Sequence, residues 1–139
     1  MTSQSNAADK RQEIYQDLHG LLSAQEAGNV ISAQRILDIV MDYHRPASVL
    51  DVGCGLGTWL KVVQSRGISD IAGIDGAWLD VSKLRVDQRL VEVRDLEKPF
   101  DLGRRFDLVI CLEVAEHLSA NAADNFISSL TLAASSTES

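Results

Sequence analysis

Three glycines within five residues constrain this chain more than any other feature of its sequence. They lie in the segment "VLDVGCGLGTWL" (49–60), between a short apolar run and a second apolar run with helical character. Glycine has no Cβ and adopts positive φ angles at little cost, so Gly53, Gly55 and Gly57 allow a sharp turn and the close approach of a ligand to the backbone. The segment therefore predicts a strand, a tight turn and a helix.

The rest of the chain alternates β-rich runs with helical patterns. Strands are expected over 48–52, 70–75, 89–94 and 106–111. Helices are expected over 9–28, from 29 to Pro46, over 58–67 and over 121–133, with Gly28 and Asn29 separating the first two. Strands that alternate with helices are typical of parallel sheets with right-handed crossovers. The expected fold class is α/β, a Rossmann-like doubly wound parallel sheet with N-terminal helices.

Composition and charge limit the partners of this chain. Its 139 residues suggest one domain. A net charge of −7 argues against a nucleic-acid binder, which usually carries a basic surface. No apolar run approaches the roughly 18 residues that span a membrane, and the polar N-terminus lacks the apolar core of a signal peptide, so a cytoplasmic location is expected. Cys54 and Cys111 are expected to be reduced thiols, and no zinc spacing is present, so no metal site is expected.

Acidic residues follow the predicted strands. Asp75 ends the second strand, Asp95 follows the third and Glu113 follows the fourth. Ligands of open parallel sheets bind at the carboxyl ends of the strands, where a carboxylate can accept hydrogen bonds from ribose hydroxyls. An acceptor after the third strand can take a proton from an adenine amino group. Each residue alone is equally compatible with a turn or cap, but together they predict a nucleoside-binding crevice.

The glycine spacing separates two kinds of nucleoside cofactor. The dinucleotide fingerprint is GxGxxG, with a pyrophosphate at the helix N-terminus. This chain has GxGxG followed by Thr58, and Asp51 stands two residues before the first glycine. A carboxylate there would repel a pyrophosphate and could accept hydrogen bonds from an ammonium group. The pattern therefore favours a cationic ligand over a nicotinamide dinucleotide.

As a set, four segments resemble the motifs of the class I S-adenosylmethionine-dependent methyltransferases. They are "VLDVGCGLGTWL", "IAGIDG", "VEVRDLEKPF" and "FDLVICLEVAEHL", in the order of the family's first four motifs. The resemblance implies S-adenosylmethionine as cofactor and methyl transfer to an unidentified acceptor, a small molecule or a glycan. It divides the chain into a disordered tail (1–8), an N-terminal helix (9–28), a cofactor-binding domain (29–133) that is incomplete at its C-terminus, and a tail (134–139).

The resemblance also implies a set of cofactor-binding residues from all four strand ends: Asp51, Gly53, Cys54, Gly55, Gly57, Asp75, Gly76, Asp95, Leu96, Cys111, Leu112 and Glu113. The glycine turn would pass beside the methionine part of the cofactor, and Asp51 would support its amino group. Asp75 would hold the ribose hydroxyls, while Asp95 and the Leu96 amide would face the adenine. Trp78 could cover the adenine, although a purely structural role fits it equally well.

Methyl transfer requires a general base only when the acceptor must lose a proton as it attacks. Glu113 and His117 are the candidates for this role. They are four residues apart at the expected start of a helix, which can place both on one face. For His117, a capping or packing role is favoured over a catalytic role.

The family fold has seven strands in the order 3-2-1-4-5-7-6, and this chain supplies the first four. A truncated enzyme is therefore expected, with two alternatives: a non-catalytic S-adenosylmethionine-binding module and an NAD-dependent oxidoreductase domain. In the order 3-2-1-4 the strand at 106–111 is an edge. Its consecutive apolar residues Leu108, Val109 and Ile110 suit a strand covered on both faces, so self-association through this strand is expected.

Overall fold

The computed structural model describes residues 24–112, 114 and 118–134. Four parallel strands form one sheet in the order β3-β2-β1-β4. The strands are β1 (Ser48–Val52), β2 (Asp70–Asp75), β3 (Val91–Val93) and β4 (Leu108–Cys111). The helices are α2 (Ala24–Tyr43), α3 (Thr58–Ser65) and α4 (Ala120–Ala133), with short 3₁₀ turns η1 (Val81–Lys83) and η2 (Gln88–Leu90). The predicted α/β class and strand order are confirmed.

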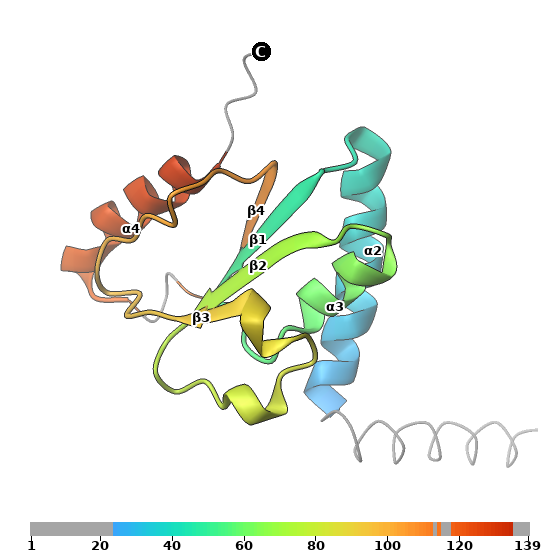
Figure 1. Cartoon of the computed structure of the whole chain (residues 1–139), viewed down its shortest axis with the longest axis horizontal. Coiled ribbons are helices and arrows are strands. Elements are labelled where there is room, and N and C mark those ends of the chain that lie inside the picture. The colour runs from blue at the N-terminus through green and yellow to red at the C-terminus, as the bar shows by residue number, and fades with distance from the viewer. Residues whose placement is uncertain (1–23, 113, 115–117, 135–139) are drawn as a thin grey trace, which may run out of the picture.

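Helices cover both faces of the sheet. Figure 1 shows α2 and α3 on one face and α4 on the other. The central strand β1 is buried along its whole length, as expected for a strand covered on both sides. Val49 packs in the cluster on the α2–α3 face, whereas Leu50 and Val52 pack in the cluster on the α4 face. The alternation of strand side chains thus divides the core into two layers.

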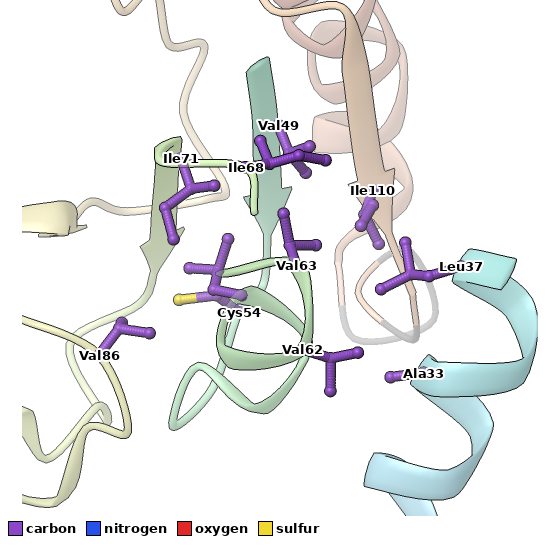
Figure 2. Packing of buried hydrophobic residues seen from close by; sticks show 11 residues of the cluster. Ala33, Leu37, Val49, Cys54, Val62, Val63, Ile68, Ile71, Val86 and Ile110 are labelled. Atoms are coloured by element: carbon purple, nitrogen blue, oxygen red, sulfur yellow. The ribbon is translucent and has the colours of Figure 1, made fainter. Parts of the chain in front are cut away.

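The α2–α3 layer fixes the helix that follows the glycine turn. In Figure 2, Ala33 and Leu37 point from α2 toward α3 and the sheet, where Val62 and Val63 complete the layer. These four side chains are almost fully buried. An ion pair between Arg66, just after α3, and Asp38 of α2 joins the same two helices at the surface. This packing holds α3, and with it the end of the turn, against the sheet.

The predicted break at Gly28 and Asn29 is wrong, because α2 runs through both residues as one helix of 20 residues. Glycine in a helix interior costs only about 1 kcal/mol relative to alanine and does not prevent helix formation. The burial of Ala33 and Leu37 one to two turns further along favours a continuous helix. Residues 9–23 of the expected first helix, and the tails at 1–8 and 135–139, lie outside the described residues.

Strand β4 has β1 as its only strand partner in the described part of the chain. On its other side, Phe106 forms a single parallel bridge with Ala134, and its amide donates to the Ala133 carbonyl at 2.8 Å. The edge position expected for this strand is confirmed. Within the described ranges, no helix has the length and apolar character of a membrane span, and no cluster of metal-ligating side chains occurs.

Two glycine substitutions test this packing in opposite directions. A Cβ on Gly73 of β2 would lie 2.8 Å from both Cys54 Sγ and Leu60 Cδ1, whereas a Cβ on Gly28 meets nothing within 4 Å. Gly73→Ala should lower the free energy of unfolding by about 1–3 kcal/mol through overpacking. Gly28→Ala should raise it by about 0.5–1 kcal/mol, because alanine is the better helix former. Urea unfolding followed by circular dichroism measures both, and a stable Gly73→Ala variant would contradict the described contact.

Candidate functional site

The glycine turn joins β1 to α3 and is tied to the neighbouring strand. Gly53, Gly55 and Gly57 have φ angles of 80°, 54° and 84°, which place all three in the left-handed region that favours glycine. The amides of Gly53 and Cys54 both donate to the Ile74 carbonyl, at 2.8 Å and 3.2 Å. The backbone conformation is therefore a sufficient reason for these glycines. Hydrogen bonds to β2 fix the position of the turn.

Asp75, the last residue of β2, reaches into this turn. One carboxylate oxygen, Oδ2, accepts the Gly55 amide at 2.7 Å, and the other, Oδ1, accepts the Gly76 amide at 2.7 Å. The side chain is buried and held in one orientation by these two bonds. A carboxylate can accept about four hydrogen bonds, so acceptor capacity remains on both oxygens. The residue is thus prepared to receive two further donors, such as the hydroxyls of a diol.

A cavity of about 530 Å³ opens at the carboxyl ends of the strands. This volume lies within the range of small-molecule sites. Segments that follow all four strands line it, and the residues are Gly53, Asp75, Trp78, Asp95, Leu96, Glu97, Leu112, Val114 and Leu118. The predicted crevice therefore exists where the strand ends meet, with one acidic side and one apolar side.

The sequence-predicted residues divide into those at the cavity and those beside it. Of the predicted set, Gly53, Asp75, Asp95, Leu96 and Leu112 line the cavity. Trp78, the candidate adenine cover, lines it too. The residues beside it are Asp51, Cys54, Gly55, Gly57, Gly76 and Cys111. Glu113 and His117, the candidate bases, lie outside the described residues.

Two of the residues beside the cavity have structural roles that the sequence did not predict. The Cys54 side chain is buried in the α2–α3 layer instead of facing the cavity. Gly76 lies directly under the Trp78 ring, because a Cβ there would be 2.2 Å from the ring atom Cζ3. Trp78 is nevertheless 74% exposed, so its other surface is open to solvent and to the cavity.

Sequence reasoning missed three lining residues, Glu97, Val114 and Leu118. Glu97 stands two positions after Asp95, and its amide donates to Asp95 Oδ1 at 3.0 Å. This Asx-type turn is a common property of aspartate in loops, so the proximity of Glu97 could have been inferred from the spacing. No comparable signal marks Val114 or Leu118, because their position depends on the path of the connection between β4 and α4.

Asp51 is a buried carboxylate next to the cavity. It is 4% exposed, and no described residue donates a hydrogen bond to its side chain. Burial, and secondly the negative charge of Asp75, raise its pKa to about 7. No lysine or arginine lines the cavity among the described residues. The carboxylates of Asp75, Asp95 and Glu97 at the cavity, with Asp51 buried beside it, therefore favour a cationic ligand and disfavour a pyrophosphate.

Both thiols are in environments that suppress reactivity. Burial, and then the charges of Asp51 and Asp75, raise the pKa of Cys54 far above its ordinary value. Burial, and then Asp51, raise the pKa of Cys111 to about 11. Both cysteines are free thiols, as predicted. Because the thiolate is the reactive form, neither side chain fits a nucleophilic role near neutral pH.

Sequence comparison relates the chain to methyl-transferring proteins. A family model described as a methyltransferase domain matches residues 7–131. The ubiquinone biosynthesis O-methyltransferase of Neisseria meningitidis serogroup C is 36% identical over 87 residues, which are 57% of this chain and 37% of that protein. The protein of the same name from Coxiella burnetii (strain RSA 493) is 32% identical over 76 residues, 50% of this chain and 32% of the relative. The chain thus spans about a third of the length of these curated relatives.

Solved structures share the fold. CalS10, an amino pentose methyltransferase from Micromonospora echinaspora with S-adenosylmethionine bound, superposes with a TM-score of 0.61 at 23% identity, over 75% of this chain and 45% of that one. DesVI from Streptomyces venezuelae superposes with a TM-score of 0.60 at 22% identity, over 89% of this chain and 53% of DesVI. At these identities the similarity concerns the fold alone.

The buried Asp51 makes stability depend on pH. Its folded-state pKa of about 7 lies above the ordinary value of 3.8, so the folded state holds a proton that the unfolded state releases. The free energy of unfolding should therefore fall as the pH rises from about 4 to about 7, and then level off. Asp51→Asn should be more stable than the wild type above pH 7, by about 2–4 kcal/mol, and the difference should vanish below pH 4.

Chemical unfolding at a series of pH values measures this difference. Asp80→Asn is the control, because that exposed carboxylate has a pKa lowered by hydrogen bonds from Ser82 and should show no such gain. Equal stability of Asp51→Asn and the wild type at pH 8 would contradict the raised pKa.

Proposed function

The match to the methyltransferase domain covers most of the chain, which therefore belongs to the class I S-adenosylmethionine-dependent methyltransferases. We propose that the chain binds S-adenosylmethionine in the cavity described above. We further propose that it serves methyl transfer to a small-molecule or glycan acceptor. The observation that carries the proposal is the acidic side of the cavity, built on the glycine turn. The cofactor brings a sulfonium and an ammonium group, and the carboxylates of Asp75, Asp95 and Glu97 line the cavity, while Asp51 lies buried beside it with a pKa raised to about 7.

Each acidic residue has a distinct proposed partner on the cofactor. Asp75 would accept both ribose hydroxyls, because two backbone amides already orient its carboxylate and leave acceptor capacity on each oxygen. Asp95 would use Oδ2 for the adenine amino group, since Oδ1 accepts the Glu97 amide. Asp51 would face the ammonium group, whose charge would offset the repulsion from Asp75. The residues present therefore fit this cofactor.

The bound cofactor supplies an activated methyl group on a positively charged sulfur. The tasks of the chain are to hold the donor in one position and to keep water away from it. The apolar lining residues Leu112, Val114 and Leu118, from the connection between β4 and α4, suit the second task. Glu113 and His117 stay predictions as general bases.

The class of the acceptor rests on the relatives. Two relatives are ubiquinone biosynthesis O-methyltransferases, and one structurally similar protein is an amino pentose methyltransferase. Their names indicate small-molecule and sugar acceptors for those proteins. A non-catalytic cofactor-binding module stays the alternative prediction. A methyl-transfer assay with phenolic and amino-sugar acceptors separates the two. The cytoplasmic location stays a prediction.

Cofactor selectivity is the direct test of the site. The wild type should bind S-adenosylhomocysteine in calorimetry and should not bind NAD. Asp75→Ala should lose about 30- to 150-fold in affinity, since two charge-assisted hydrogen bonds are removed. Asp101→Ala is the control, because this exposed carboxylate caps the Gly103 amide and does not line the cavity. Tight NAD binding, or wild-type affinity in a folded Asp75→Ala variant, would overturn the proposed site.

We also propose that the free edge of β4 pairs with β4 of a second copy of this chain. Ile39, Tyr43 and Leu108 line a groove of about 260 Å³ between the end of α2 and the start of β4. Ile39 is 65% exposed and Tyr43 is 94% exposed. An unpaired strand beside exposed apolar side chains is a template for association.

Charge on α2 supports a second copy as the proposed partner. Arg35 and Asp42 lie on either side of Ile39, and neither forms an ion pair with another described residue. If two α2 helices pack antiparallel about Ile39, Arg35 of each copy comes near Asp42 of the other. Antiparallel pairing of two β4 strands around a two-fold axis produces this arrangement on the α2 face.

Sedimentation velocity over a concentration series tests the dimer. The wild type should show a concentration-dependent dimer, which Arg35→Glu should weaken through repulsion from Asp42 of the other copy. The double variant Arg35→Glu with Asp42→Arg should restore it, since the charges are exchanged. A wild type that stays monomeric at all concentrations would contradict the proposal.

A further inference from the structure

Glu97 connects two walls of the cavity that are far apart in the sequence. Its two carboxylate oxygens bind one residue, Ser119: Oε1 accepts the Ser119 amide at 3.0 Å, and Oε2 accepts the Ser119 hydroxyl at 2.7 Å. Ser119 precedes the first residue of α4, and its own side chain makes no cap hydrogen bond within that helix. The carboxylate of Glu97 therefore accepts the amide of the N-cap residue, as the glutamate of a capping box does, near the end of the helix where the dipole favours negative charge.

The loop after β3 fixes Glu97 for this contact. Asp95 Oδ1 accepts the Glu97 amide at 3.0 Å, and the Asp95 carbonyl accepts the Lys98 amide at 3.1 Å. These two bonds close a tight turn around Glu97. Asp95 therefore has two roles, because the same residue lines the cavity and orients its neighbour toward α4.

The contact with Ser119 anchors the apolar side of the cavity. Leu112, Val114 and Leu118 belong to the connection from β4 to α4, and all three line the cavity. Before these residues, Cys111 is held by its pairing with Val52 of β1. After them, Ser119 is held by Glu97.

Val114 shows how close this side lies to the glycine turn. A Cβ built on Gly53 would be 2.1 Å from Val114 Cγ2, so the valine packs directly on the backbone of the turn. A displacement of Val114 would therefore open the cavity at the turn itself.

We propose that Glu97 is a positioning residue of the cofactor site, which acts through Ser119 to hold the neighbouring Leu118 against the bound cofactor. The inference rests on the proposed function of this cavity. Glu97 also lines the cavity, so a direct bond to the cofactor is the competing explanation. The two explanations differ in one respect: only the positioning role requires Ser119.

A double-mutant cycle on S-adenosylhomocysteine affinity separates them. Glu97→Ala should weaken binding about tenfold, and Ser119→Ala should weaken it about three- to fivefold, because the serine amide remains as a donor. In the Glu97→Ala background, Ser119→Ala should have no further effect. Ser119→Thr should bind like the wild type, since threonine keeps the hydroxyl. Additive effects of the two alanine substitutions, or unchanged affinity in Glu97→Ala, would overturn the positioning role.

A matched control isolates position from stability. Asp70 of β2 binds Arg104 through two hydrogen bonds of 2.8 Å and, like Glu97, is exposed, but it lies at the opposite end of its strand from Asp75. Asp70→Ala should lower stability to a similar extent and leave the affinity unchanged. A similar loss of affinity in this control would assign the effect of Glu97 to general destabilisation and would overturn the proposal. Absence of S-adenosylhomocysteine binding by the wild type would instead refute the proposed function of the cavity.

Discussion

The hydrogen bonds from the Gly55 and Gly76 amides to Asp75 hold the site together. They join the turn after β1 to the turn after β2, and they orient a buried carboxylate at the edge where the strands end. An unpaired carboxylate in this position would be costly to bury, and the two amides reduce that cost. The bond to the Gly55 amide also fixes one of the three left-handed glycines of the turn, so the shape of the turn and the orientation of the acid depend on each other.

The site carries a cost in stability that its function explains. Asp51 and Asp75 are both buried, and burial, followed by the negative charge of Asp75, raises the pKa of Asp51 to about 7. A fold selected for stability alone would have no reason to place two carboxylates together. Binding of a cationic ligand would offset this repulsion, and mass action then stabilises the folded state. Strain of this kind is common at functional sites, and here it lies next to the cavity described above.

The sequence predicted the parts of the fold that local rules determine. β1 and β2 have the expected bounds, because each is a β-rich run that ends at a glycine or at an aspartate typical of turns, which fixes where the strand stops. The break at Gly28 was wrong because helix packing outweighed a weak local preference. The place of the Cys54 backbone beside the cofactor stays a prediction, whereas its side chain fills the space above Gly73, which depends on tertiary contacts. Val114 and Leu118 were missed for the same reason.

Parallel strand topology explains why so few residues can define this site. All four strands point in one direction, so each strand end contributes its next residues to the same edge. The two turns on the β1–β2 side are fixed by backbone hydrogen bonds to Asp75 and Ile74. Among the described residues, the loops after β3 and β4 are joined by the side-chain hydrogen bonds between Glu97 and Ser119. Asp75 is therefore oriented by backbone amides, whereas the loops after β3 and β4 meet through one carboxylate next to the N-terminus of α4.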